Sequence, residues 1–66
     1  MPEEWSGTIR LLQSARGHEM KLDRLANHLY NEGVLAPEIY HAPEILAYDL
    51  QRFGVVTYDA VGRTVS

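Results

Sequence analysis

The chain has 66 residues, a net charge of −3 and no cysteine. A chain of this length forms one domain at most and buries only about 60% of the surface that its unfolded form exposes. The absence of cysteine excludes disulfides and thiolate metal sites, so self-association or a partner is the natural source of extra stability. We therefore expect a single domain over residues 1–66 that forms a homodimer.

The composition is typical of a globular protein, because 45% of the residues are hydrophobic and 23% are charged. No apolar run approaches the roughly 18 residues that cross a bilayer. The acidic start, residues 1–4, is the opposite of the basic start of a signal peptide. These features predict a cytoplasmic protein that does not contact a membrane.

Three apolar stripes with helical spacing predict three helices. The stripes consist of Trp5, Ile9 and Leu12, of Leu22, Leu25, Ala26 and Leu29, and of Leu46, Leu50 and Phe53. A glycine follows each stripe and is placed to end the helix, at Gly17, Gly33 and Gly54. We expect helices near residues 3–16, 22–32 and 43–53.

The stretch APEIYHAPEILA, residues 36–47, contains the phrase Ala-Pro-Glu-Ile twice. Proline followed by a carboxylate is typical of a helix start. Pro43 disfavours helical geometry at the residue before it, so the helix that begins at Pro37 makes no more than one turn. The first start therefore reorients the chain, and the second begins the long third helix.

The pattern changes after Gly54. Residues 55–58 are β-branched or aromatic, residues 59–62 are typical of a turn, and residues 63–65 return to strand composition. This pattern predicts a β-hairpin over residues 55–65.

The order of elements resembles the winged helix-turn-helix fold. The resemblance rests on Gly17 and Met20 before Leu22-x-x-Leu25-Ala26-x-x-Leu29, and on Leu46-x-x-x-Leu50-x-x-Phe53-Gly54-Val55-Val56. It implies an α+β fold of three helices with a C-terminal β-hairpin wing. It also implies a small DNA-binding protein, a transcriptional regulator or accessory factor that acts as a dimer on double-stranded DNA.

Two departures from that fold leave a second function open. Residues 34–42 separate the second and third helices, whereas such connections usually have three or four residues. The first half of the third helix, residues 43–49, has two acids and no base, which argues against ordinary operator binding. The alternative is a winged-helix protein-interaction module, or a small acidic inhibitor, that binds a basic protein partner through residues 36–51.

The candidate contacts to DNA or to a partner fall into two groups. The bases of residues 10–24, together with Arg52 and Arg63, are suited to phosphate contacts, although a solvated face explains them about as well. Glu44, Ala47, Tyr48 and Gln51 share the face of the third helix opposite Leu46, Leu50 and Phe53. The full set of candidates is Arg10, Arg16, Lys21, Arg24, Glu44, Tyr48, Gln51, Arg52 and Arg63.

The remaining apolar residues suggest a dimer interface, because a small core has little room for them. The candidates are Trp5, Val34, Leu35 and Ile39. The sequence has no cysteine nucleophile, and its three histidines lack paired ligand spacing. We therefore expect no enzymatic activity, no cofactor, no metal and no small-molecule substrate.

Overall fold

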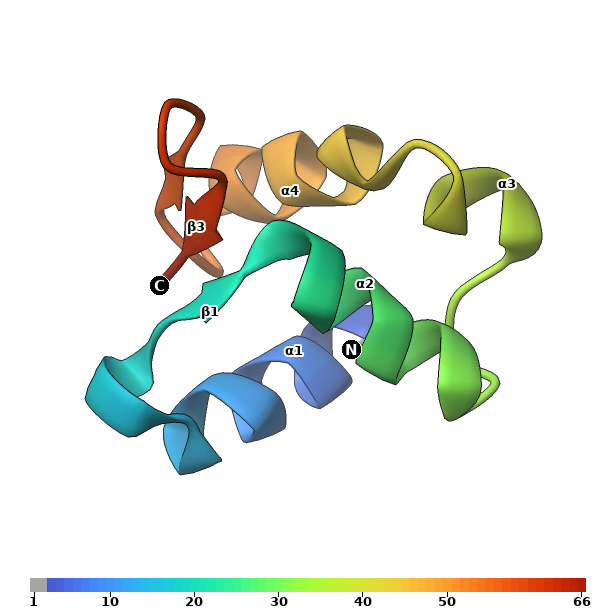
Figure 1. Cartoon of the computed structure of the whole chain (residues 1–66), viewed down its shortest axis with the longest axis horizontal. Coiled ribbons are helices and arrows are strands. Elements are labelled where there is room, and N and C mark those ends of the chain that lie inside the picture. The colour runs from blue at the N-terminus through green and yellow to red at the C-terminus, as the bar shows by residue number, and fades with distance from the viewer. Residues whose placement is uncertain (1–2) are drawn as a thin grey trace.

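The structure, a computed structural model, describes residues 3–66. Within them the chain is α+β, with four α-helices, a 3₁₀ turn and a three-stranded antiparallel sheet (Figure 1). The elements are α1 (Glu3–Ser14), η1 (Arg16–His18), β1 (Met20–Lys21), α2 (Leu22–Asn31), α3 (Pro37–Tyr40), α4 (Pro43–Arg52), β2 (Tyr58–Asp59) and β3 (Thr64–Val65).

The three predicted long helices are confirmed as α1, α2 and α4, within two residues at each end. Two of them close in the same way. The amides of Val34 and Val55 donate to carbonyls five residues earlier, at 3.0 and 2.9 Å, and a glycine with positive φ precedes each valine. This αL glycine arrangement satisfies carbonyls that the last helical turn leaves unpaired.

The doubled helix start is also confirmed. Pro37 begins α3, which has four residues, and Pro43 begins α4. Between them Ala42 has φ −134° and ψ 65°, a conformation outside the helical region. The chain therefore turns at this residue, and α4 returns across α2 (Figure 1).

The core lies around α2, which sits between α1 and α4 (Figure 1). Leu22, Leu25 and Leu29 of α2 are completely buried. They contact a buried set contributed by the other elements: Leu12, Leu35, Leu46, Ala47, Leu50, Val56, Tyr58 and Val65. A single hydrophobic core therefore joins the helices to the sheet.

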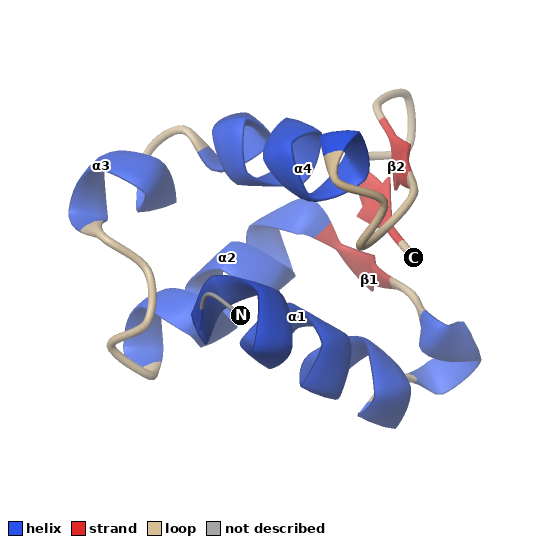
Figure 2. Ribbon diagram, turned by 180° about the vertical axis from the view of Figure 1, so that it is seen from behind, coloured by secondary structure: helices blue, strands red, loops and turns tan. Residues whose placement is uncertain are grey.

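The sheet lies at the end of the molecule opposite α3 (Figure 2). Its strand order is β1-β3-β2, with Met20 opposite Val65 and Tyr58 opposite the same valine. The predicted hairpin is confirmed as β2 and β3, but its first strand lies later than predicted: paired hydrogen bonds join Thr57 to Ser66, Asp59 belongs to β2, and Val55 and Val56 precede the hairpin. The short β1 completes the sheet and directs the chain into α2.

Candidate functional site

The exposed face of α4 carries two large apolar side chains. Ile45 and Tyr48 are each 52% exposed, and Asp49 is exposed next to Tyr48. The Tyr48 ring meets the ring of Tyr58 edge-on, with centroids 5.5 Å apart. This contact holds Tyr48 against β2. A side chain held in this way loses little further freedom on binding, which suits an anchor in an interface.

This face differs from the one that the sequence predicts. Ala47 is fully buried, whereas Phe53 is 60% exposed. The buried stripe consists of Pro43, Leu46, Ala47 and Leu50. Because α4 ends at Arg52, Phe53 leaves the stripe, and its ring centroid lies 5.2 Å from that of Trp5. The predicted inward position of Phe53 and the predicted exposed position of Ala47 are therefore wrong.

Gln51, a predicted contact residue, has a partner within the chain. Its Oε1 accepts a hydrogen bond from the amide of Tyr58 at 2.8 Å. The bond joins the last turn of α4 to the start of β2. It occupies the amide oxygen with which a glutamine would contact a base.

Glu44 and Arg63, both predicted to contact a ligand, contact each other. Arg63 donates from Nη1 to Glu44 Oε1 at 2.6 Å and from Nη2 to Asp23 Oδ1 at 2.9 Å. The hydrogen bond from Arg63 holds the pKa of the Glu44 carboxyl below its ordinary value of 4.5, and the two carboxylates raise the pKa of Arg63. This acidic–basic cluster ties the end of the β2–β3 turn to the first turns of α2 and α4.

The tip of the β2–β3 turn is apolar. Val61 is 98% exposed, and its amide donates to Asp59 Oδ1 at 3.1 Å. Lys21 Nζ donates to the carbonyl of Gly62 at 2.8 Å, so the turn is fixed to β1. We refer to four of the exposed residues of α4 and of this turn, Ile45, Tyr48, Asp49 and Val61, as the α4–turn surface.

The other predicted cations lie away from this surface or at its margin. Arg10 pairs with Glu32 at 2.7 Å, and the Arg52 guanidinium lies 5.8 Å from the centroid of the Phe53 ring. The remaining three, Arg16, Lys21 and Arg24, line a groove of about 640 Å³ whose walls come from α1, η1, β1, α2 and β3. The basic stretch of residues 10–24 therefore does not extend the exposed face of α4.

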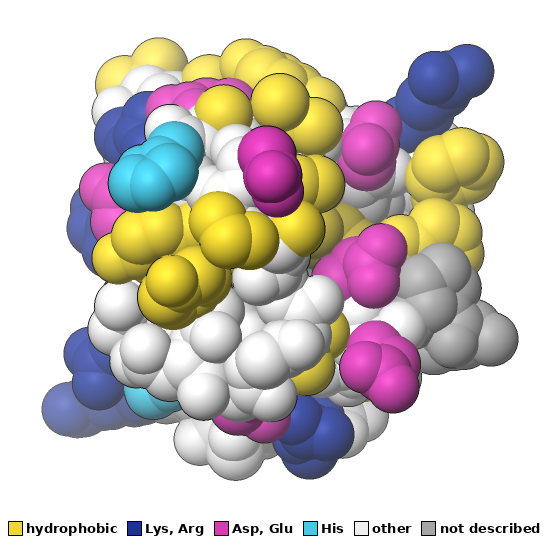
Figure 3. Space-filling view, turned by 90° about the vertical axis from the view of Figure 1, so that its right-hand side faces the viewer, with side chains coloured by type: hydrophobic (Ala, Val, Ile, Leu, Met, Phe, Trp, Pro, Cys, Tyr) yellow, Lys and Arg dark blue, Asp and Glu magenta, His cyan; other side chains and the backbone are white. Residues whose placement is uncertain are grey.

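The residues predicted for a dimer interface lie largely within the chain's own packing. Leu35 belongs to the core, while Trp5, Val34 and Ile39 pack against it and are partly buried. The burial of Leu35 removes it from any outer surface. Figure 3 shows the α3 end of the molecule, where hydrophobic side chains alternate with carboxylates. Self-association itself stays a prediction.

Two residues of the α4–turn surface are absent from the sequence-based set of contacts. Ile45 stands next to Leu46 in the sequence, and the apolar pattern alone groups it with the buried stripe of α4. Val61 stands in a turn, where small and polar residues are usual. An apolar residue at a turn position is the feature of the sequence that could have identified Val61 as a contact residue.

Neither a metal cluster nor a membrane-spanning helix is found in residues 3–66. In this part of the chain no three side chains of His, Cys, Asp or Glu come together to hold a metal ion. No helix there has the length and apolar character that crossing a membrane requires.

Comparisons of the chain with models of protein families, with curated proteins and with solved structures found no match.

Proposed function

We propose that the chain is a winged helix-turn-helix domain that binds a protein partner through α4 and the wing. The order helix, strand, helix, short helix, helix, hairpin supports the fold, as does the β1-β3-β2 strand order. In this proposal α2 and α4 are the helix-turn-helix pair, and the β2–β3 turn is the tip of the wing. The one-turn α3 lengthens the connection between them.

The observation that carries this function is the pairing of Arg63. A winged helix that binds DNA relies on cations near the recognition helix and the wing, because phosphate contacts supply most non-specific affinity. Here the cation that ends the wing is engaged by Glu44 and Asp23. The tip presents Val61 instead. The surface that would face DNA is thus apolar and acidic.

The α4–turn surface defines the chemistry of the partner. Ile45 and Tyr48 supply apolar area for the centre of an interface, where aromatic anchors contribute most of the affinity. Asp49 of this surface and Asp59 of the turn are exposed acids suited to the rim of an interface. We therefore propose a partner with an apolar pocket and a basic rim. A small acidic inhibitor of a basic protein is one form of this function.

The test uses a photo-crosslinking amino acid at position 48, with position 31 as the control on the exposed end of α2. We expect position 48 to crosslink a partner in cells that position 31 does not. With the purified partner, Tyr48→Ala should weaken binding by at least about tenfold, the effect of losing an interface anchor. Wild-type affinity in Tyr48→Ala contradicts the proposal.

DNA binding is the second candidate, and the proposed recognition-helix and wing arrangement favours it. In that case the protein is a dimeric regulator or accessory factor, and Arg16, Lys21, Arg24 and Arg52 supply phosphate contacts. Wild-type protein should then bind random duplex DNA at about 50 mM salt, with a slope of about −0.9 per phosphate contact.

Charge reversal at Asp49 separates the two functions. Glu44 is less suited to this test, because a lysine there would face Arg63. Asp49 forms no ion pair with any residue in the range 3–66. Asp49→Lys should tighten DNA binding by removing repulsion. It should slow association with a basic protein and reduce the dependence of that association on salt.

A further inference from the structure

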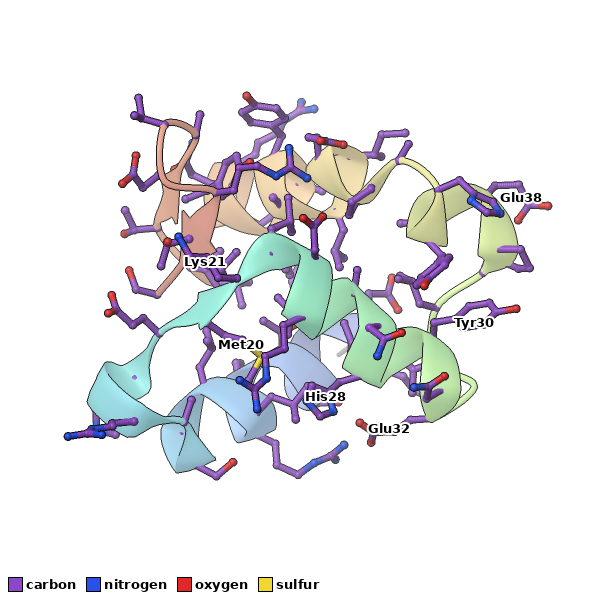
Figure 4. The ribbon with its side chains drawn as sticks, viewed as in Figure 1. Met20, Lys21, His28, Tyr30, Glu32 and Glu38 are labelled. Carbon is purple, nitrogen blue, oxygen red and sulfur yellow. The ribbon has the colours of Figure 1, made fainter. Side chains whose placement is uncertain are left out.

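A second surface, away from the α4–turn surface, has the shape and charge of a binding groove. It lies between the C-terminal half of α1, η1, β1 and the first turns of α2, with a volume of about 640 Å³. Figure 4 shows the side chains of Met20 and His28 over the region between α1 and α2. Both line the groove.

The rim of the groove is cationic. Arg16, Lys21 and Arg24 line it and are exposed, with Glu19 as the single acid among the lining residues. Within residues 3–66, neither Arg16 nor Arg24 forms an ion pair. Lys21 donates one hydrogen bond to Gly62, which leaves two donors of its ammonium group. The groove thus concentrates positive charge on a protein of net charge −3.

The floor of the groove is apolar. Leu11, Ala15 and Met20 line it and are partly buried, so each presents some apolar surface to the opening. A bare phosphate backbone gains nothing from such a floor. A peptide gains from both parts, since one apolar side chain covers the floor while flanking carboxylates meet the arginines. Methionine adapts its shape to different apolar side chains.

We propose that this groove binds a short acidic peptide segment of another protein, with one apolar side chain on the floor and carboxylates on Arg16 and Arg24. The proposal is independent of the partner of the α4–turn surface, because the two surfaces share no residue. It gives the domain two docking sites of opposite character. The first is apolar and acidic, and the second is a cationic groove.

The test uses a labelled nine-residue peptide with one central leucine and four Asp or Glu residues on either side. We expect it to shift the backbone amide resonances of residues 14–21, 24 and 28 in ¹⁵N-labelled protein. Replacing the leucine by serine should weaken binding, because the floor then loses its apolar contact. Equal binding of the serine peptide, or shifts confined to α4, would overturn the proposal.

Matched charge variants test the rim. Arg24→Gln should weaken peptide binding by about threefold, within the range of an exposed ion pair, and Arg16→Gln by a similar factor. Arg52→Gln removes the same charge outside the groove and should leave the affinity unchanged. An equal loss in all three variants would mean that only net charge matters, which rejects the site. Thermal denaturation by circular dichroism checks that each variant is folded.

Two other occupants give different results. Random duplex DNA could displace the peptide at a concentration lower than that of the peptide itself. If the binding of DNA is also weakened by Arg24→Gln, the groove is assigned to nucleic acid. Concentration-dependent self-association that Arg24→Gln abolishes would assign it to the acidic face of a second copy. Either result overturns the proposed peptide site, and neither depends on whether Tyr48 binds a partner.

Discussion

The guanidinium of Arg63 lies 2.6 Å from the carboxylate of Glu44, and this ion pair fastens the last residue of the β2–β3 turn to the first turn of α4. Arg63 has φ 51°, a backbone conformation that L residues seldom adopt. The Arg63 side chain also donates a hydrogen bond to Asp23. The same side chain thus fixes the turn to two helices and has its positive charge paired with two carboxylates.

The Glu44–Arg63 pair predicts a dependence of stability on pH. The folded pKa of Glu44 lies below its unfolded value, so the pair stabilises the fold above about pH 4.5 and loses this effect as the pH falls through the folded pKa. We expect the melting temperature to fall on acidification. In Arg63→Met this fall should be smaller, because Glu44 no longer has the partner that lowers its pKa. Arg52→Met is the control, and an unchanged pH profile in Arg63→Met contradicts the assignment.

Gln51 should contribute to stability through the amide of Tyr58. Gln51→Ala removes the acceptor and leaves a partly buried N–H unpaired, at a cost of about 1–3 kcal/mol. Gln51→Glu keeps an acceptor and should lose less. Urea denaturation gives the free energies of unfolding, and hydrogen exchange at Tyr58 reports the bond directly. If the Tyr58 amide exchanges at the same rate in both variants and in the wild type, Gln51 does not stabilise the fold through this bond.

Two apolar residues on α4 should behave in opposite ways. Leu50 is completely buried, so Leu50→Ala should cost about 2–5 kcal/mol. A domain of this length has a stability of roughly 3–10 kcal/mol, so the variant should lose a large fraction of its stability. Ile45→Ala, at an exposed position, should change stability by no more than about 0.5 kcal/mol. A large loss in Ile45→Ala would mean that α4 is oriented differently.

Self-association is best tested at the Trp5–Phe53 pair. The ring centroids lie 5.2 Å apart with the ring planes tilted by 37°, and Phe53 remains 60% exposed, so the pair offers apolar area without disrupting the core. We expect sedimentation at high micromolar concentration to show a dimer and Phe53→Ser to reduce its population. Leu35 is unsuitable for this test because its substitution would damage the core. A wild-type monomer under these conditions contradicts the prediction.

The helices were predictable because each signal is local. A helical stripe of leucines and a following glycine both act within a few residues, and the bounds of α2 and α4 agree with them. The faces of α4 that are buried and exposed were harder to predict from the sequence. Small Ala47 gives a weak signal in a hydrophobic pattern, yet it is fully buried in the core.

The ion pairs of Arg63 could not be predicted, because they join residues distant in sequence. Arg63 meets Asp23 across 40 positions, and the backbone of Arg63 itself is left-handed, with φ 51°. The sequence shows that both residues are charged. It does not show that they neutralise each other, so a wing cation was expected where an ion pair is found.

Gly7 lies where α1 meets α2, and a Cβ atom at this position would lie 2.9 Å from Cδ2 of the fully buried Leu29. The end of α1 that borders the groove is about two turns further along the helix. The packing at Gly7 therefore helps to set the position of α1, including its end at the groove. A methyl group there must displace either the end of the Leu29 side chain or α1 itself, and a shift of α1 would change the width of the groove. A residue that does not line the groove can thus set its shape.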